Sequence, residues 1–180
     1  MGESISRGGD IKTGRSFLEQ SLALSRQEDM PNVIAFALES LARLARLEGD
    51  NARAEAHYME CAHIRRQMGF RTGLAEALVS LGQVSLQEGD AVQAKATAEE
   101  CLVIYRELRI VPDQVYCLAG FAGAVALAGQ DERAARLFGA VKAAAETLDL
   151  KMDDFIEGVD SIVTAGDFID MTEGAQIIFI

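Results

Sequence analysis

The sequence predicts an all-α fold, a superhelical solenoid of antiparallel helix pairs with a capping helix at its carboxyl end. The first observation behind this prediction is a repeat of 40 residues, marked by Gly9, Gly49, Gly89 and Gly129. The second is that apolar residues between these glycines recur at the spacing of a helix. The third is that no stretch shows a competing strand pattern. Because a helix pair cannot bury its apolar face alone, we expect the repeated pairs to stack on one another.

Each period holds two helices, and small groups of residues mark the breaks between them. Gly49 and its equivalents can adopt a positive φ angle and end the first helix of a pair, while Asp50 or Asp90 caps the next helix. The second kind of break is less uniform, and it falls at residues 31–32, 69–72 and 112–113, which offer caps for the helices that follow. The predicted helices cover residues 11–28, 32–48, 51–68, 73–88, 91–109, 113–128 and 131–148.

The repeated residues resemble those of tetratricopeptide repeats. One unit has the pattern Leu38-x-x-Leu41-Ala42, then Gly49-Asp50, Ala54, Tyr58 and Cys61, and two further units follow in the same register. The sequence departs from the family at Ala98, which replaces an aromatic residue, and in its period of 40 residues where about 34 is commonest. The resemblance covers residues 9–148 and implies a groove lined by the first helix of each pair.

A narrower likeness concerns residues 134–146, which follow residues 127–131. This segment is similar to the last repeat of the helical region that ends many bacterial LuxR-type and signal-transduction ATPase regulators. The resemblance implies that the chain is a carboxyl-terminal piece of a regulator for signal transduction or transcription, without the ATPase or DNA-binding segment. We predict a single domain with a truncated first repeat, three full repeats and an acidic capping helix with a tail, bounded as 1–30, 31–69, 70–110, 111–149 and 150–180.

The predicted groove residues lie on the inner side of each first helix, beside the leucine and alanine columns that pack inward. We expect a peptide or protein segment to bind there, with a carboxylate near Arg43 and Arg46 and an apolar side chain near Tyr116. A second interpretation is that both arginines are solvated and paired with Glu39, four residues before Arg43. The predicted groove comprises Phe36, Glu39, Arg43 and Arg46, then Glu76, Val79 and Gln83, then Tyr116, Ala119 and Gly123.

The leading functional hypothesis is therefore a non-catalytic scaffold for protein–protein interaction, without a cofactor. The alternative is a small-molecule sensor that encloses an effector near Arg43, Gln83 and Tyr116. His57, Cys61 and His63 are the one group with metal-ligand chemistry, but Cys61 shares its repeat column with Cys101 and Val141, which predicts a packing position. Neither a metal site nor an enzyme is predicted.

The composition limits the kinds of partner that the protein can bind and indicates the cellular compartment in which it folds. The chain has 17 lysines and arginines and 28 aspartates and glutamates, and the resulting net charge of −11 argues against binding to nucleic acid. The uncharged residues 114–130 are rich in alanine and glycine, so they predict a helix–helix interface and no membrane span. Three widely spaced cysteines without a C-x-x-C motif favour the reducing cytoplasm over a disulfide framework.

The carboxyl end concentrates the negative charge. Residues 143–180 hold nine acids and one base, which predicts a capping helix with an acidic outer face or a surface that docks onto a basic partner. The final residues 175–180 are uncharged and apolar, so they either pack on the last helices or expose an edge prone to self-association. A homo-oligomer is therefore possible through this tail or through the truncated first repeat.

Overall fold

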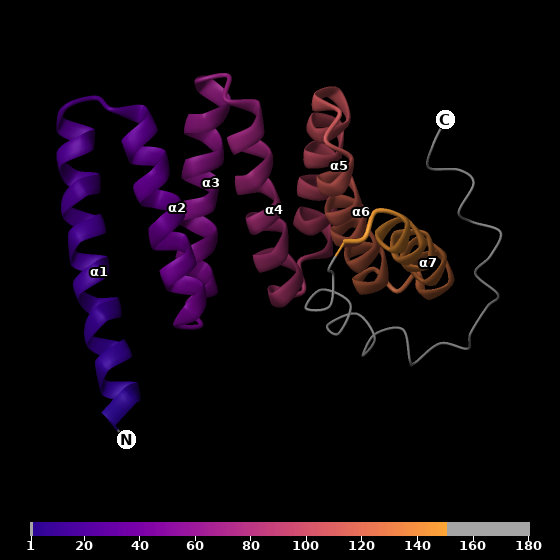
Figure 1. Cartoon of the computed structure of the whole chain (residues 1–180), viewed down its shortest axis with the longest axis horizontal. Coiled ribbons are helices and arrows are strands. Elements are labelled where there is room, and N and C mark those ends of the chain that lie inside the picture. The colour runs from indigo at the N-terminus through magenta and orange to yellow at the C-terminus, as the bar shows by residue number, and fades with distance from the viewer. Residues whose placement is uncertain (1, 151–180) are drawn as a thin grey trace. The chain divides into compact units, whose positions relative to one another are not determined.

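The computed structural model describes residues 2–150, with side chains from residue 11 onward. Within that range all regular structure is helical, and successive helices are joined by tight turns (Figure 1). This confirms the predicted all-α fold. The predicted capping helix and the tail at residues 175–180 lie outside the described residues. The helices are α1 (Gly2–Gln27), α2 (Pro31–Leu47), α3 (Asn51–Gln67), α4 (Arg71–Glu88), α5 (Ala91–Leu108), α6 (Val111–Leu127) and α7 (Asp131–Thr147).

The chain forms two compact units that divide within α4. The first unit ends at Val84 and the second begins at Ser85. In the first unit α1 packs on α2 and α2 packs on α3; in the second, α5 packs on α6 and α6 on α7. Most of the uncharged segment 114–130 lies in α6, which is flanked by two helices of its own unit, as its alanine and glycine content predicts.

A residue with a positive φ angle follows each helix at intervals of 20 residues. Four of these residues are glycines, and at Gly49, Gly89 and Gly129 the φ angles of 78°, 77° and 71° confirm the predicted breaks. The backbone closes each break in the same way: the N–H of Asp50 donates to the carbonyl of Ala45 at 2.9 Å, and the N–H of Gly49 donates to that of Arg46 at 3.0 Å. This Schellman arrangement satisfies carbonyls that the end of the helix leaves unpaired.

Gly9 is an exception to the predicted pattern, because it lies inside α1. The first helix therefore begins at Gly2, well before the expected residue 11. A glycine permits a left-handed residue without requiring one, and a glycine within a helix costs only about 1 kcal/mol relative to alanine. The 40-residue register alone was insufficient to place a break there.

The second set of breaks has less uniform residues, as predicted, but its backbone is as regular as that of the first set. The residues with positive φ there are Asp29 (51°), Gly69 (68°), Arg109 (58°) and Asp149 (52°), again 40 residues apart. Three of the four are not glycine, which is why the sequence pattern does not reveal them. A non-glycine residue in this conformation costs about 1–2 kcal/mol, and aspartate adopts it more readily than arginine does.

Four helices start in one of two ways, with an aspartate cap at α3 and α5 or with a proline at α2 and α6. Asp50 accepts a hydrogen bond from the N–H of Arg53 at 3.0 Å, and Asp90 accepts from those of Val92 and Gln93. These contacts confirm the predicted aspartate caps. At α2 and α6, however, a proline in the first turn replaces a side-chain cap, so both helices begin slightly earlier than predicted. Proline suits this position because its missing N–H would be unpaired there in any case.

The core is built from the small and apolar columns of the repeat. Ala54 and its equivalents Ala94 and Ala134 are all buried, as are Leu38 and Leu78. In the first unit, one cluster joins three successive helices, which holds α2, α3 and the second half of α4 in a fixed relation. Its members are Ala42, Ala45, Ala54, Tyr58, Leu81 and Val84.

Candidate binding face on α2 and α4

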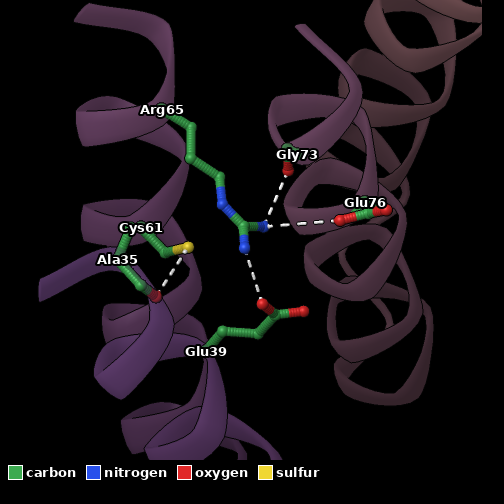
Figure 2. Close-up of polar contacts among 6 residues, drawn as sticks. All are labelled: Ala35, Glu39, Cys61, Arg65, Gly73 and Glu76. Carbon is green, nitrogen blue, oxygen red and sulfur yellow. Dashed lines mark hydrogen bonds and ion pairs between the residues drawn. The ribbon is translucent and has the colours of Figure 1, made fainter. Parts of the chain in front are cut away.

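A buried arginine from α3 links α2 to α4 in the first unit (Figure 2). The Arg65 side chain is only 8% exposed, and its Nη2 lies 2.6 Å from Oε2 of Glu39 on α2. Its Nη1 donates to the carbonyl oxygen of Gly73 at 2.8 Å and lies 4.0 Å from Oε2 of Glu76, both on α4. One guanidinium therefore compensates two carboxylates that belong to different helices.

The start of α4 is shaped to admit this arginine. A Cβ atom added at Gly73 would lie 2.4 Å from the Phe70 ring and 3.0 Å from Nε of Arg65, so a side chain there would displace one of them. The Phe70 ring in turn lies against the guanidinium, with 5.9 Å between its centroid and Cζ of Arg65. Gly73 thus provides the space in which the ring and the cation meet.

Sequence reasoning missed Arg65, although a signal was available. Arg65 occupies the same repeat register as Tyr105 and Ala145, at steps of 40 residues. Both of these residues are buried, and so is Arg65. An arginine in a column that is otherwise apolar and buried indicates an ion pair within the fold, because a buried charge requires a partner.

Seven of the ten predicted groove residues belong to the first unit, and the structure joins four of them through polar contacts. Glu39 and Glu76 meet at Arg65, while Nη1 of Arg46 donates to Oε1 of Gln83 at 3.0 Å. These contacts connect α2 and α4 at two levels. We call the whole set the α2–α4 face; it consists of Phe36, Glu39, Arg43, Arg46, Glu76, Val79 and Gln83.

The other three residues of the α2–α4 face, Phe36, Arg43 and Val79, are exposed or half-buried. The Phe36 ring is 61% exposed, Arg43 is exposed, and Val79 is half-buried. Glu39 is bonded to Arg65, not to Arg43 or Arg46 as the solvated-pair interpretation supposed. Within the described part of the chain, Arg43 makes no ion pair, so its charge is available to a ligand.

The three other predicted groove residues lie on α6 in the second unit and have a different character. Ala119 is fully buried in a cluster with Val115 and Val141, and Tyr116 packs against that cluster. Gly123 is buried as well, and a Cβ atom there would lie 3.2 Å from a side-chain carbon of Leu86. Ala119 and Gly123 therefore serve helix packing, and we assign the candidate face to the first unit alone.

The three residues of α3 with metal-ligand chemistry differ in exposure: Cys61 is buried, His57 is half-buried and His63 is exposed. Cys61 is fully buried, and its thiol donates to the carbonyl of Ala35 at 3.3 Å. Burial raises the pKa of the Cys61 thiol to about 11. Cys101 and Val141, its equivalents in the repeat, are buried too, so the predicted packing column is confirmed. Over residues 11–150, no three histidine, cysteine or acidic side chains gather as metal ligands.

Comparison with known proteins adds no family to this picture. No protein-family model matches the chain, and no curated protein matches it either. The resemblance to tetratricopeptide repeats therefore stays a prediction from the residues. Across the described range, no helix combines the length and the apolar character that crossing a bilayer would require.

Proposed function

We propose that this protein is a non-catalytic interaction scaffold whose α2–α4 face binds a peptide or protein segment. The observation that carries the proposal is the pair of unengaged side chains on α2, the exposed Phe36 and Arg43. They stand seven residues apart, which is two helical turns, so they project from the same side of the helix. An aromatic ring beside a cation suits a ligand that combines an apolar side chain with a carboxylate.

The charge of the face supports the same ligand chemistry. Counting Arg65, which lies behind it, the face has three arginines and two glutamates, whereas the whole chain has a net charge of −11. Arg65 engages both glutamates, so neither opposes an incoming carboxylate at full strength. The face is thus a locally cationic area on an acidic protein, and such complementarity mainly favours the rate and specificity of association.

In a wider role, we propose that the scaffold serves as the sensor or assembly part of a cytoplasmic bacterial regulator in signal transduction or transcription. Residues 134–146 support this extension through their likeness to such regulators. A homo-oligomer through residues 1–30 is a further proposal, and the exposed side chains of Phe17 and Leu24 on α1 support it. Light scattering over a dilution series measures the oligomeric state directly.

The test is selection of short random peptides displayed on phage, with immobilised wild-type protein as bait. We expect enriched peptides to carry an apolar or aromatic residue near an aspartate or glutamate. Arg43→Glu and Phe36→Ala are expected to weaken their binding at least tenfold, and added salt is expected to weaken it further. Equal helicity of all variants is checked first by circular dichroism.

The matched controls are Lys142→Glu, which reverses one exposed charge on α7, and Val92→Ala, which removes an exposed apolar side chain on α5. Neither should change the affinity of the selected peptides. If the enriched peptides bind all variants equally, the α2–α4 face is not the surface that recognises them. If no peptide is enriched, the scaffold proposal for this face is wrong and the small-molecule sensor becomes the hypothesis to pursue.

A further inference from the structure

Two cysteines of the second unit lie in direct contact between neighbouring helices. The Sγ atoms of Cys101 on α5 and Cys117 on α6 are 2.6 Å apart. This separation exceeds the length of a disulfide bond, about 2.05 Å, by roughly half an ångström. Both residues are almost fully buried, with 1% and 2% of their surface exposed. The two sulfur atoms therefore lie side by side between α5 and α6.

Small residues bring these two helices close together. Ala98 lies one turn before Cys101, and a Cβ atom added at Gly120 would lie 4.0 Å from the Ala98 side chain. The contact therefore belongs to the packing of α5 on α6 and does not depend on a flexible loop. The third cysteine, Cys61, lies in the first unit, where its thiol contacts a backbone carbonyl.

We propose that Cys101 and Cys117 are a redox-modification site that forms an intramolecular disulfide in exchange with a low-molecular-weight disulfide. The thiolate of one cysteine attacks a sulfur atom of oxidised glutathione and releases one glutathione thiolate. The second cysteine then attacks the protein sulfur of this mixed disulfide and releases the second glutathione. In total, two protein thiols are oxidised to one disulfide, and one oxidised glutathione is reduced to two glutathione molecules.

Burial determines when this exchange takes place. The hydrogen bond with Cys101, and after it burial, raises the pKa of the Cys117 thiol, so that the thiolate is scarce in the folded protein at neutral pH. Glutathione also has no access to atoms that are 1–2% exposed. The bond therefore forms during folding or while α5 and α6 are transiently apart, and once formed it is shielded from reductants.

The disulfide would stabilise the second unit. It closes a short loop, since Cys117 follows Cys101 by 16 positions in the sequence. A loop of this length restricts the unfolded chain enough to raise the midpoint of thermal unfolding by about 6–12 °C in a protein of this size. A chain that folds under oxidising conditions would therefore be more stable than one that folds under reducing conditions.

The test starts from the reduced full-length chain in denaturant, which is refolded in glutathione buffers ranging from fully reduced to fully oxidised. We expect titratable thiols, counted under denaturing conditions after removal of glutathione, to fall from three to one per chain. Trypsin cleaves between the two cysteines after Arg106 and Arg109, so unreduced digests should contain residues 96–106 linked to residues 110–133. The linked pair should disappear on reduction.

Three single variants make the result decisive. Cys61→Ala should keep both the linked peptides and the rise in thermal midpoint, whereas Cys101→Ala and Cys117→Ala should lose both. Alanine is small enough for these buried sites, and circular dichroism confirms folding of each variant. The proposal is overturned if even oxidised glutathione alone leaves the two peptides unlinked, or carrying only glutathione adducts. It is also overturned if Cys61 is found joined to either partner in the folded wild-type protein.

Discussion

Replacement of Arg65 by methionine tests the physical basis of the α2–α4 face. The variant keeps most of the apolar stem but removes the guanidinium, which donates to Glu39 at 2.6 Å and to the Gly73 carbonyl at 2.8 Å. The Arg65 side chain is 8% exposed and that of Glu39 is 23% exposed, so solvent can replace the lost contacts only in part. Removing one partner from a buried ion pair typically costs about 3–5 kcal/mol. We expect the free energy of unfolding to fall by about 3–4 kcal/mol.

The assay is urea unfolding of the full-length chain, followed by circular dichroism at the helical band because the sequence has no tryptophan. A double-mutant cycle with Glu39→Gln isolates the pair. Its coupling energy should be about 1–2 kcal/mol, since Glu76 and the Gly73 carbonyl still engage the guanidinium when Glu39 is neutralised.

Arg43→Met is the matched control, because Arg43 is an exposed arginine on the same face. It should change stability by no more than about 0.5 kcal/mol. A loss of less than about 1 kcal/mol in Arg65→Met, or a coupling energy near zero, would show that Arg65 does not compensate the two glutamates as described. The explanation for the cationic character of the face would then be incorrect.

Three further predictions concern individual residues. The Tyr58 hydroxyl is buried and has no hydrogen-bond partner among the described residues, so Tyr58→Phe should raise the free energy of unfolding by about 1 kcal/mol in urea. Arg109 has a φ angle of 58°, so Arg109→Gly should increase the free energy of unfolding by about 1 kcal/mol and raise the thermal midpoint. Gly129 has a φ angle of 71°, so Gly129→Ala should decrease the free energy of unfolding by about 1 kcal/mol and lower the midpoint. Burial lowers the pKa of His57 below its ordinary value of about 6.5, so protonation favours the unfolded state. From pH 7.5 to pH 5 the wild type should therefore lose stability relative to His57→Gln, and parallel curves for the two proteins would contradict this.

The sequence alone was sufficient for the class of fold and most helix boundaries. Helical periodicity, the left-handed glycines and the aspartate caps are local properties, in which each residue acts on neighbours within one turn. Gly49 with Asp50, and Gly89 with Asp90, therefore mark helix ends in the printed sequence as clearly as in the structure. The buried columns were predictable too, because three units repeat the same register.

Other features were decided by tertiary structure, because they depend on residues that are distant in the chain. Arg65 is buried only because Glu39, 26 residues earlier, and the α4 residues Gly73 and Glu76 converge on it. Arg109 adopts a left-handed conformation because the packing of α5 against α6 imposes a turn at that residue, against its own preference. Ala119 has the repeat register of a groove residue yet is buried by α7. Periodicity indicates which side of a helix a residue occupies, but only the neighbouring helices determine whether that side faces solvent, a charge or another side chain.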